Sequence, residues 1–224
     1  MKIIIKVLFL FWFLSFNTLA EETKSFGLPS YWENLKQVQK DFYMKGALDA
    51  WGYYIWNNAP DSQRDLLISQ YRYCIKKESK NFQQYMFMLG WNKDENAASE
   101  IYKWSSAACS NLSKTNDYKD IKVNKNQPLE NVTQKVWIQM SNENKSSYIA
   151  GYVDGSLDTT KSIVENPNVD KEALDYYQDL LNRVNNCFKN NGFDNLIPFI
   201  IARELNESYP IAWNISLSMG AFCR

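Results

Sequence analysis

The chain has 224 residues with 25 basic and 25 acidic side chains, so its formal net charge is zero. This balance gives no electrostatic reason to expect binding to nucleic acid or to an anionic membrane surface. Histidine is absent, which excludes His-based acid–base catalysis, His-activated nucleophiles and metal sites built with histidine.

Residues 1–20 have the features of a secretory signal peptide. Lys2 and Lys6 flank the start of an apolar run, and Thr18 and Ala20 form a small-x-small cleavage site. The run is shorter than the about 20 residues that a membrane-spanning helix needs. We therefore predict export to the periplasm or the cell exterior, with no stable membrane insertion after cleavage. An uncleaved N-terminal anchor is the alternative.

Helical periodicity dominates residues 25–110, which we predict to be the first of two modules. Ser30 and Glu33 form a capping-box pattern, and the apolar positions that follow predict one helix continuing to Ile55. An Asn-Ala-Pro-Asp segment ends that helix, and Asp61 or Ser62 is suited to cap the next.

The second predicted helix carries an apolar face from Leu66 to Cys74. A short buried helix is predicted from Phe82 to Leu89, and a fourth helix from Asp94 to Cys109. Strand patterns are weak throughout, so the pattern indicates an all-α fold.

Residues 111–128 are rich in Lys, Asn and Asp and are predicted to be a polar linker. The second module, residues 129–224, again shows helical periodicity. Ser141 is suited to cap a helix towards Ile163, Asp170 begins another, and Pro210 fits the first turn of the last one.

Four cysteines in a chain with a predicted export signal favour disulfides over free thiols. Cys74 and Cys109 are separated by almost the same number of positions as Cys187 and Cys223, which favours pairing within each half. A four-cysteine zinc site is the rival, but it normally uses short paired spacings such as C-x-x-C, and none occurs.

The two halves show an internal similarity. Placing Trp32 over Trp137 also aligns Tyr43 with Tyr148, Gly46 with Gly151 and Asp49 with Asp154. A register shifted by four instead aligns Tyr43–Asp49 with Tyr152–Asp158, and the sequence leaves both registers open. A similarity with this period predicts two tandem, disulfide-closed helical modules that arose by internal duplication.

Asp154 and Asp158 lie one helical turn apart and therefore share a face. Such a pair is a candidate binding site for a cation or a shared proton. The alternative, which we favour, is that Gly46 and Gly151 permit close helix packing while the aspartates lie in solvent. A glycan hydrolase would need only two carboxylates. Its nominal candidates are Glu143, Asp154, Asp158, Glu204 and Glu207.

Aromatic residues are abundant, and most tryptophans recur at helical spacing, which favours core packing over a stacking surface. Tyr53, Tyr54 and Trp56 form the densest cluster and are predicted to be an exposed binding patch. Tyr148 and Tyr152, which precede the two aspartates, are further candidate binding residues.

The second half resembles the Tai-type immunity proteins of type VI secretion systems. The resemblance rests on the segment Tyr148-Ile-Ala-Gly-Tyr-Val-Asp-Gly, on Cys187, on the apolar stretch Leu196–Leu205 and on the final Ala-Phe-Cys223. The chain is also similar to periplasmic chaperones of the HdeA type. Both resemblances imply a helical, disulfide-closed protein of the periplasm, and neither assigns a functional residue.

The sequence shows no nucleotide-binding loop and no metal-ligand spacing, so we predict no cofactor, no metal and no catalytic residue. The favoured function is non-catalytic binding of another protein, as an inhibitor, immunity factor or chaperone. A cell-wall or glycan hydrolase with an Asp and Glu pair is the alternative, and it predicts a cleft between two carboxylates.

Overall fold

The computed structural model describes residues 29–88, 96–113, 131–203 and 205–224, and the regular elements in these ranges are all helices. This confirms the all-α prediction. The predicted signal peptide at 1–20 lies outside the described residues, as does the predicted linker apart from residues 111–113, which belong to a helix.

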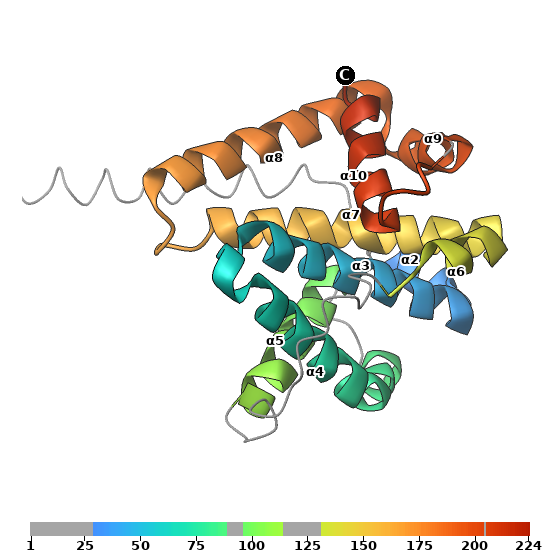
Figure 1. Ribbon diagram of the computed structural model, residues 1–224. Helices are drawn as coiled ribbons and strands as arrows, with labels where there is room; N and C mark the ends of the chain where they lie inside the picture. The colour runs from blue at the N-terminus through green and yellow to red at the C-terminus, as the bar shows by residue number, and fades with distance from the viewer. Residues whose placement is uncertain (1–28, 89–95, 114–130, 204) are drawn as a thin grey trace, which may run out of the picture.

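Two long helices, α3 (Gln37–Asn58) and α7 (Asn142–Val164), form the centre of the molecule. They lie side by side, run in the same direction and make the most extensive helix–helix contact of the described chain (Figure 1). A short helix precedes each of them, α2 (Pro29–Asn34) before α3 and α6 (Gln134–Gln139) before α7.

The remaining helices pack around this central pair, α4 and α5 next to α3, α8 and α9 next to α7, and α10 next to α9 and α3 (Figure 1). They are α4 (Asp61–Met88), α5 (Ala97–Ser113), α8 (Lys171–Asn191), the 3-10 helix η2 (Phe193–Asn195), α9 (Leu196–Ala202) and α10 (Ile211–Phe222). The two halves also cross, because α5 contacts α7 and α10 contacts α3.

The buried apolar side chains form one cluster that draws on both halves of the chain. Tyr43 and Ile101 from the first half and Tyr148 and Ile215 from the second are all fully buried in it. Residues 25–110 and 129–224 therefore share a core where they are described, and their independence as modules stays a prediction.

Side-chain caps fix the starts of the second-half helices. The Ser141 hydroxyl accepts a hydrogen bond from the Asn144 N–H at 3.3 Å, and the Asp170 carboxylate accepts one from the Ala173 N–H at 2.9 Å. Such caps satisfy N–H groups that have no partner within the helix. Both predicted helix starts are confirmed.

The prediction of one continuous first helix is wrong. The structure breaks it between Asn34 and Gln37, where Lys36 adopts an extended backbone. The break lets Trp32 turn back onto Tyr43, with ring centroids 5.7 Å apart in an edge-to-face arrangement. Packing of the aromatic pair therefore overrides the continuous apolar pattern.

The separate helix predicted from Phe82 to Leu89 is also wrong, because α4 continues through Phe82 to Met88. The sequence of α4 contains neither Gly nor Pro, so no residue within it ends the helix. The predicted fourth helix is present as α5, and its start is set by Asn96, whose side chain accepts a hydrogen bond from the Ser99 N–H at 2.8 Å.

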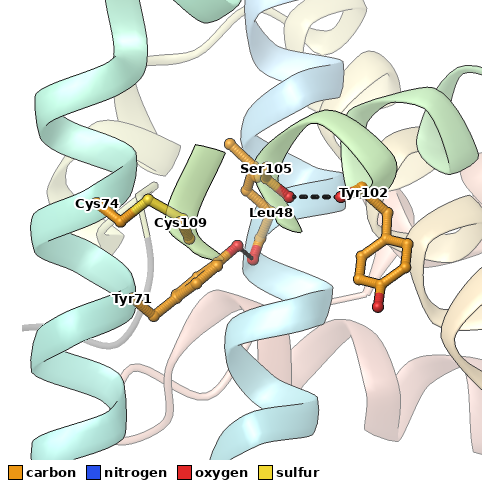
Figure 2. The surroundings of a disulfide bond; sticks show 6 residues. All are labelled: Leu48, Tyr71, Cys74, Tyr102, Ser105 and Cys109. Atoms are coloured by element: carbon orange, nitrogen blue, oxygen red, sulfur yellow. Dashed lines mark hydrogen bonds between the residues drawn. A yellow bond between two sulfur atoms is a disulfide. The ribbon is translucent and has the colours of Figure 1, made fainter. Parts of the chain in front are cut away.

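Both predicted disulfides are present, Cys74–Cys109 between α4 and α5 and Cys187–Cys223 between α8 and the end of α10. Figure 2 shows the first of them. One turn before Cys74, the Tyr71 hydroxyl donates a hydrogen bond to the Leu48 carbonyl of α3 at 2.9 Å. Together these contacts join α3, α4 and α5. In the chain-entropy model each disulfide stabilises the fold by about 4 kcal/mol.

Candidate functional site

The central contact between α3 and α7 is made at glycines. A Cβ atom at Gly46 would collide with the Tyr148 carbonyl oxygen, and a Cβ at Gly151 would collide with the Tyr43 carbonyl oxygen. One turn further along α7, a Cβ at Gly155 would lie 2.9 Å from the Ala47 carbonyl oxygen. The prediction that Gly46 and Gly151 permit close helix packing is confirmed.

Two buried tyrosine–aspartate pairs cross this contact. The Tyr43 hydroxyl of α3 donates to Asp154 Oδ2 of α7 at 2.6 Å, and the Tyr148 hydroxyl of α7 donates to Asp49 Oδ2 of α3 at 2.7 Å. Burial, with the nearby Asp154 charge, raises the pKa of Tyr43 well above its usual range, so this hydroxyl keeps its proton. The pairs are reciprocal, because each helix supplies one tyrosine and one aspartate.

A tryptophan and a lysine accompany each tyrosine. Trp32 packs edge-to-face on Tyr43, and Trp137 packs in the same way on Tyr148 with ring centroids 6.0 Å apart. Lys40 lies over the Trp32 ring and Lys145 over the Trp137 ring, both at 5.4 Å from the centroid. These contacts match the ungapped register, in which Trp32 aligns with Trp137.

Asp49 accepts hydrogen bonds from two residues. Besides Tyr148, it accepts hydrogen bonds from the backbone N–H and the side-chain amide of Asn131, with a shortest distance of 2.7 Å for each. Burial raises the pKa of Asp49 to about 6, although its hydrogen bonds and Arg72 act in the opposite direction. The hydrogen bonds therefore offset only part of the cost of removing this charge from water.

Asp154 and Asp158 lie on the same helix but contact different partners. Asp154 is 1% exposed and bonds Tyr43 of α3, whereas Asp158 is 8% exposed and accepts a hydrogen bond from the Ser99 hydroxyl of α5. Burial raises the pKa of Asp158, whose Oδ2 has no hydrogen-bond partner among the described residues. The prediction that these aspartates lie in solvent is wrong, because both hold neighbouring helices.

The other nominal carboxylates are scattered. Glu143 and Glu207 are exposed, Glu143 in the first turn of α7 and Glu207 between α9 and α10, and Glu204 lies outside the described residues. Within the described ranges no group of three or more Cys, Asp or Glu side chains is arranged to hold a metal ion.

Tyr53, Tyr54 and Trp56 are half-buried and point to three different neighbours. Tyr53 packs against Trp213 of α10, Tyr54 packs edge-to-face on Trp51, and Trp56 lies beneath the Arg64 guanidinium. Their neighbours thus come from α10, α3 and α4. Tyr152 is 2% exposed, and its hydroxyl shares a hydrogen bond of 2.7 Å with Ser216.

An open groove of about 860 Å³ lies between α8 and α10, over α7. The apolar part of its lining includes Leu180 and Val184 of α8 with Met219 of α10, and asparagines such as Asn186 and Asn190 supply much of the polar part. Among the described residues that line it, none is Asp or Glu. Sequence reasoning missed this groove, because periodicity places apolar residues on a face without showing whether another helix covers that face.

No helix in the described ranges is both long enough and apolar enough to cross a membrane. Comparison of the chain with protein-family models, with curated proteins and with solved structures finds no match.

Proposed function

We propose that the chain is an exported, non-catalytic protein that binds another protein in the periplasm or outside the cell, as an inhibitor, immunity factor or chaperone. The observation that carries this proposal is the open groove between α8 and α10, which is lined mainly by apolar and uncharged polar side chains together with Arg183 and Arg224. Protein-binding surfaces have this mixed composition, with few charges at their centre.

Export is supported by the two disulfides, which form and persist in oxidising compartments. The signal-peptide pattern of residues 1–20 supports it independently. The resemblance of the second half to periplasmic immunity proteins implies the same compartment.

The position of the carboxylates favours binding over glycan hydrolysis. A hydrolase of this kind needs two carboxyl groups that face a substrate cleft. Here Asp49 and Asp154 accept hydrogen bonds from tyrosines inside the core, and the groove lining contains no acidic residue among those described.

We also propose that the two halves arose by duplication. The helix positions support this origin, because α6 follows α2 and α7 follows α3 by the same number of residues. The glycine, tyrosine–aspartate and tryptophan–lysine contacts are also reciprocal between the two halves. A related chain of half this length, with one Tyr-x-x-Gly-x-x-Asp helix and one cysteine pair, would support this origin. Relatives that carry the motif in one half only would contradict it.

The binding function is tested by a pull-down from periplasmic or secreted extract with the oxidised mature protein as bait. Leu180→Asp places a charge in the groove at a half-buried residue outside the core cluster. Ile138→Asp is the matched control, because Ile138 is 66% exposed and lies on α6, outside the groove.

We expect one specific protein to be retained by the wild type and by Ile138→Asp, and to be lost with Leu180→Asp and with reduced bait. Retention on peptidoglycan or glycan in place of a protein would refute the binding function and favour the hydrolase.

A further inference from the structure

None of the described residues explains why position 220 of α10 is a glycine. It lies within the helix, its φ is not in the left-handed region, and a Cβ atom there would meet no described heavy atom within 4 Å. Glycine is unfavourable inside a helix relative to alanine, because it loses more backbone entropy on folding. Alanine would fit at this position, yet the chain carries glycine.

Three other glycines within the described helices lie where another helix backbone approaches. Gly46, Gly151 and Gly155 each have backbone atoms of the facing helix so close that a Cβ would not fit. Gly220 is also a glycine within a helix, but no described backbone faces it. A helix supplied by another molecule would give it the neighbour that the other three have.

The position of Gly220 fits that explanation, since it lies on the wall of the groove between α8 and α10. Ser216, one turn before it, also lines the groove, so this wall offers two small residues in succession. Opposite them, α8 contributes Leu180 and Val184. A groove with a small-residue wall and an apolar wall suits an amphipathic helix, which can approach α10 closely and bury its apolar face against α8.

The first half of the chain shows a contrast that supports an open arrangement of α8 and α10. Each disulfide joins two helices, and α4 and α5, joined by Cys74–Cys109, pack directly on each other. By contrast, α8 and α10, joined by Cys187–Cys223, leave the groove between them, and both of these cysteines line it.

The charged side chains that line the groove indicate that the partner's binding segment is acidic. The charged side chains in the groove lining are Arg183 and Arg224, and no acidic side chain is among the described lining residues. Arg183 forms an ion pair with Asp179 at 2.9 Å, but both side chains are more than half exposed, so this pair contributes little and can be exchanged.

We propose that the groove binds an amphipathic α-helix of a partner protein, with a small residue packed against Gly220 and a carboxylate directed to Arg183. This inference rests on the proposed binding function and specifies the partner at the same site. Its test needs variants that fold normally, and Gly220 offers them, because a side chain there projects into open space.

The experiment uses a phage-displayed library of helical 20-residue peptides, selected on the full-length, oxidised mature protein. Selected peptides are then synthesised, and their dissociation constants are measured by fluorescence anisotropy. Four variants are compared with the wild type: Gly220→Ala, Gly220→Leu, Arg183→Glu and, as a control for charge on the same helix, Lys189→Glu, which lies outside the groove lining. Thermal unfolding of each variant shows whether the fold is retained.

We expect selected peptides that are acidic and amphipathic with Gly, Ala or Ser at one fixed position. Gly220→Leu should weaken them at least tenfold and Gly220→Ala several-fold, while the unfolding temperature of Gly220→Ala is unchanged or raised. Arg183→Glu should weaken them at least tenfold, and Lys189→Glu less than twofold.

Absence of any enriched peptide, or peptides that bind Gly220→Leu as tightly as the wild type, would overturn this inference. Capture of a protein partner that also binds Gly220→Leu would leave the proposed function in place and refute only the helix-binding groove. Absence of any captured partner would refute the proposed function itself.

Discussion

Tyr43 and Tyr148 have equivalent roles on two neighbouring helices. Each is fully buried, and each donates its hydroxyl proton to an aspartate across the α3–α7 contact. A hydroxyl that bonds a buried carboxylate compensates part of the cost of removing that charge from water. These pairs therefore permit two carboxylates at the centre of an apolar core.

Replacing either tyrosine by phenylalanine keeps the ring and removes the donor. We expect Tyr43→Phe and Tyr148→Phe each to lower the free energy of unfolding by about 1.5–3 kcal/mol, the usual loss for a hydrogen bond to a charged group. Urea unfolding followed by circular dichroism measures the change. Tyr176→Phe is the control, because Tyr176 is 58% exposed, and a loss of similar size in the control would contradict the assignment.

Asp49 makes stability depend on pH. Its pKa is about 6 in the folded protein, because of burial. An unfolded aspartate has a pKa of about 4, so between these values the folded state binds the proton more readily than the unfolded state. The contribution of Asp49 to stability is therefore present below about pH 4 and is lost as the pH rises through about 6.

Raising the pH from 4 to 7 should lower the free energy of unfolding by roughly 2 kcal/mol through Asp49 alone. Asp158, whose pKa is also raised by burial, acts in the same direction. Asp49→Asn removes the carboxyl group of Asp49, so the free energy of unfolding should fall less over this pH range. Urea unfolding at several pH values measures both proteins, and identical pH profiles would refute the role of Asp49.

At the scale of elements, α3 and α7 can pack closely because glycines face backbone carbonyls at their contact. Gly46→Ala or Gly151→Ala would insert a methyl group where the facing helix leaves no space. We expect each to lower the free energy of unfolding by about 1–3 kcal/mol, the usual range for overpacking. Gly220→Ala is the matched control and should be neutral or stabilising by up to about 1 kcal/mol. Equal effects at all three positions would contradict close packing as the cause.

The elements also show where sequence patterns are informative. Ser141 and Asp170 set helix starts through bonds to residues three positions away, so the local sequence contains the whole signal. The disulfide pairing followed from nearly equal spacing in the two halves. The break after Asn34 was missed, because it depends on Trp32 reaching Tyr43, a contact made only after the chain turns back.

The candidate site was harder to predict from the sequence than the helices, because it is formed by contacts between residues far apart in the chain. The sequence analysis named Tyr148 and Asp154 as candidate site residues, but Tyr43 and Asp49 entered it only through the alignment of the two halves. It also placed the aspartates in solvent, because their buried partners cannot be recognised from the sequence. Tyr43 lies 111 positions from Asp154, and no local period relates them. The groove was missed for the same reason, since the path of α8 and α10 over α7 is a tertiary property.

At the scale of the whole molecule, the shared core couples the two halves. The central contact pairs a helix of the first half with one of the second, and α5 and α10 each contact the central helix of the other half. Neither half covers its own central helix alone. We therefore expect unfolding in one cooperative transition, in spite of the two similar halves and their separate disulfides.

Native-state hydrogen exchange tests this expectation in the oxidised protein. Gly151→Ala alters the contact between α3 and α7, so it should reduce the protection of slowly exchanging amides in α4 and α5 by the same factor as in α8 and α10. A loss of about 1.4 kcal/mol corresponds to a tenfold fall in protection at each of these sites. Protection that falls in α8 and α10 while staying constant in α4 and α5 would mean that the halves unfold separately. The shared core would then be an interface between two modules, and the reciprocal tyrosine–aspartate pairs would be the contacts that join them.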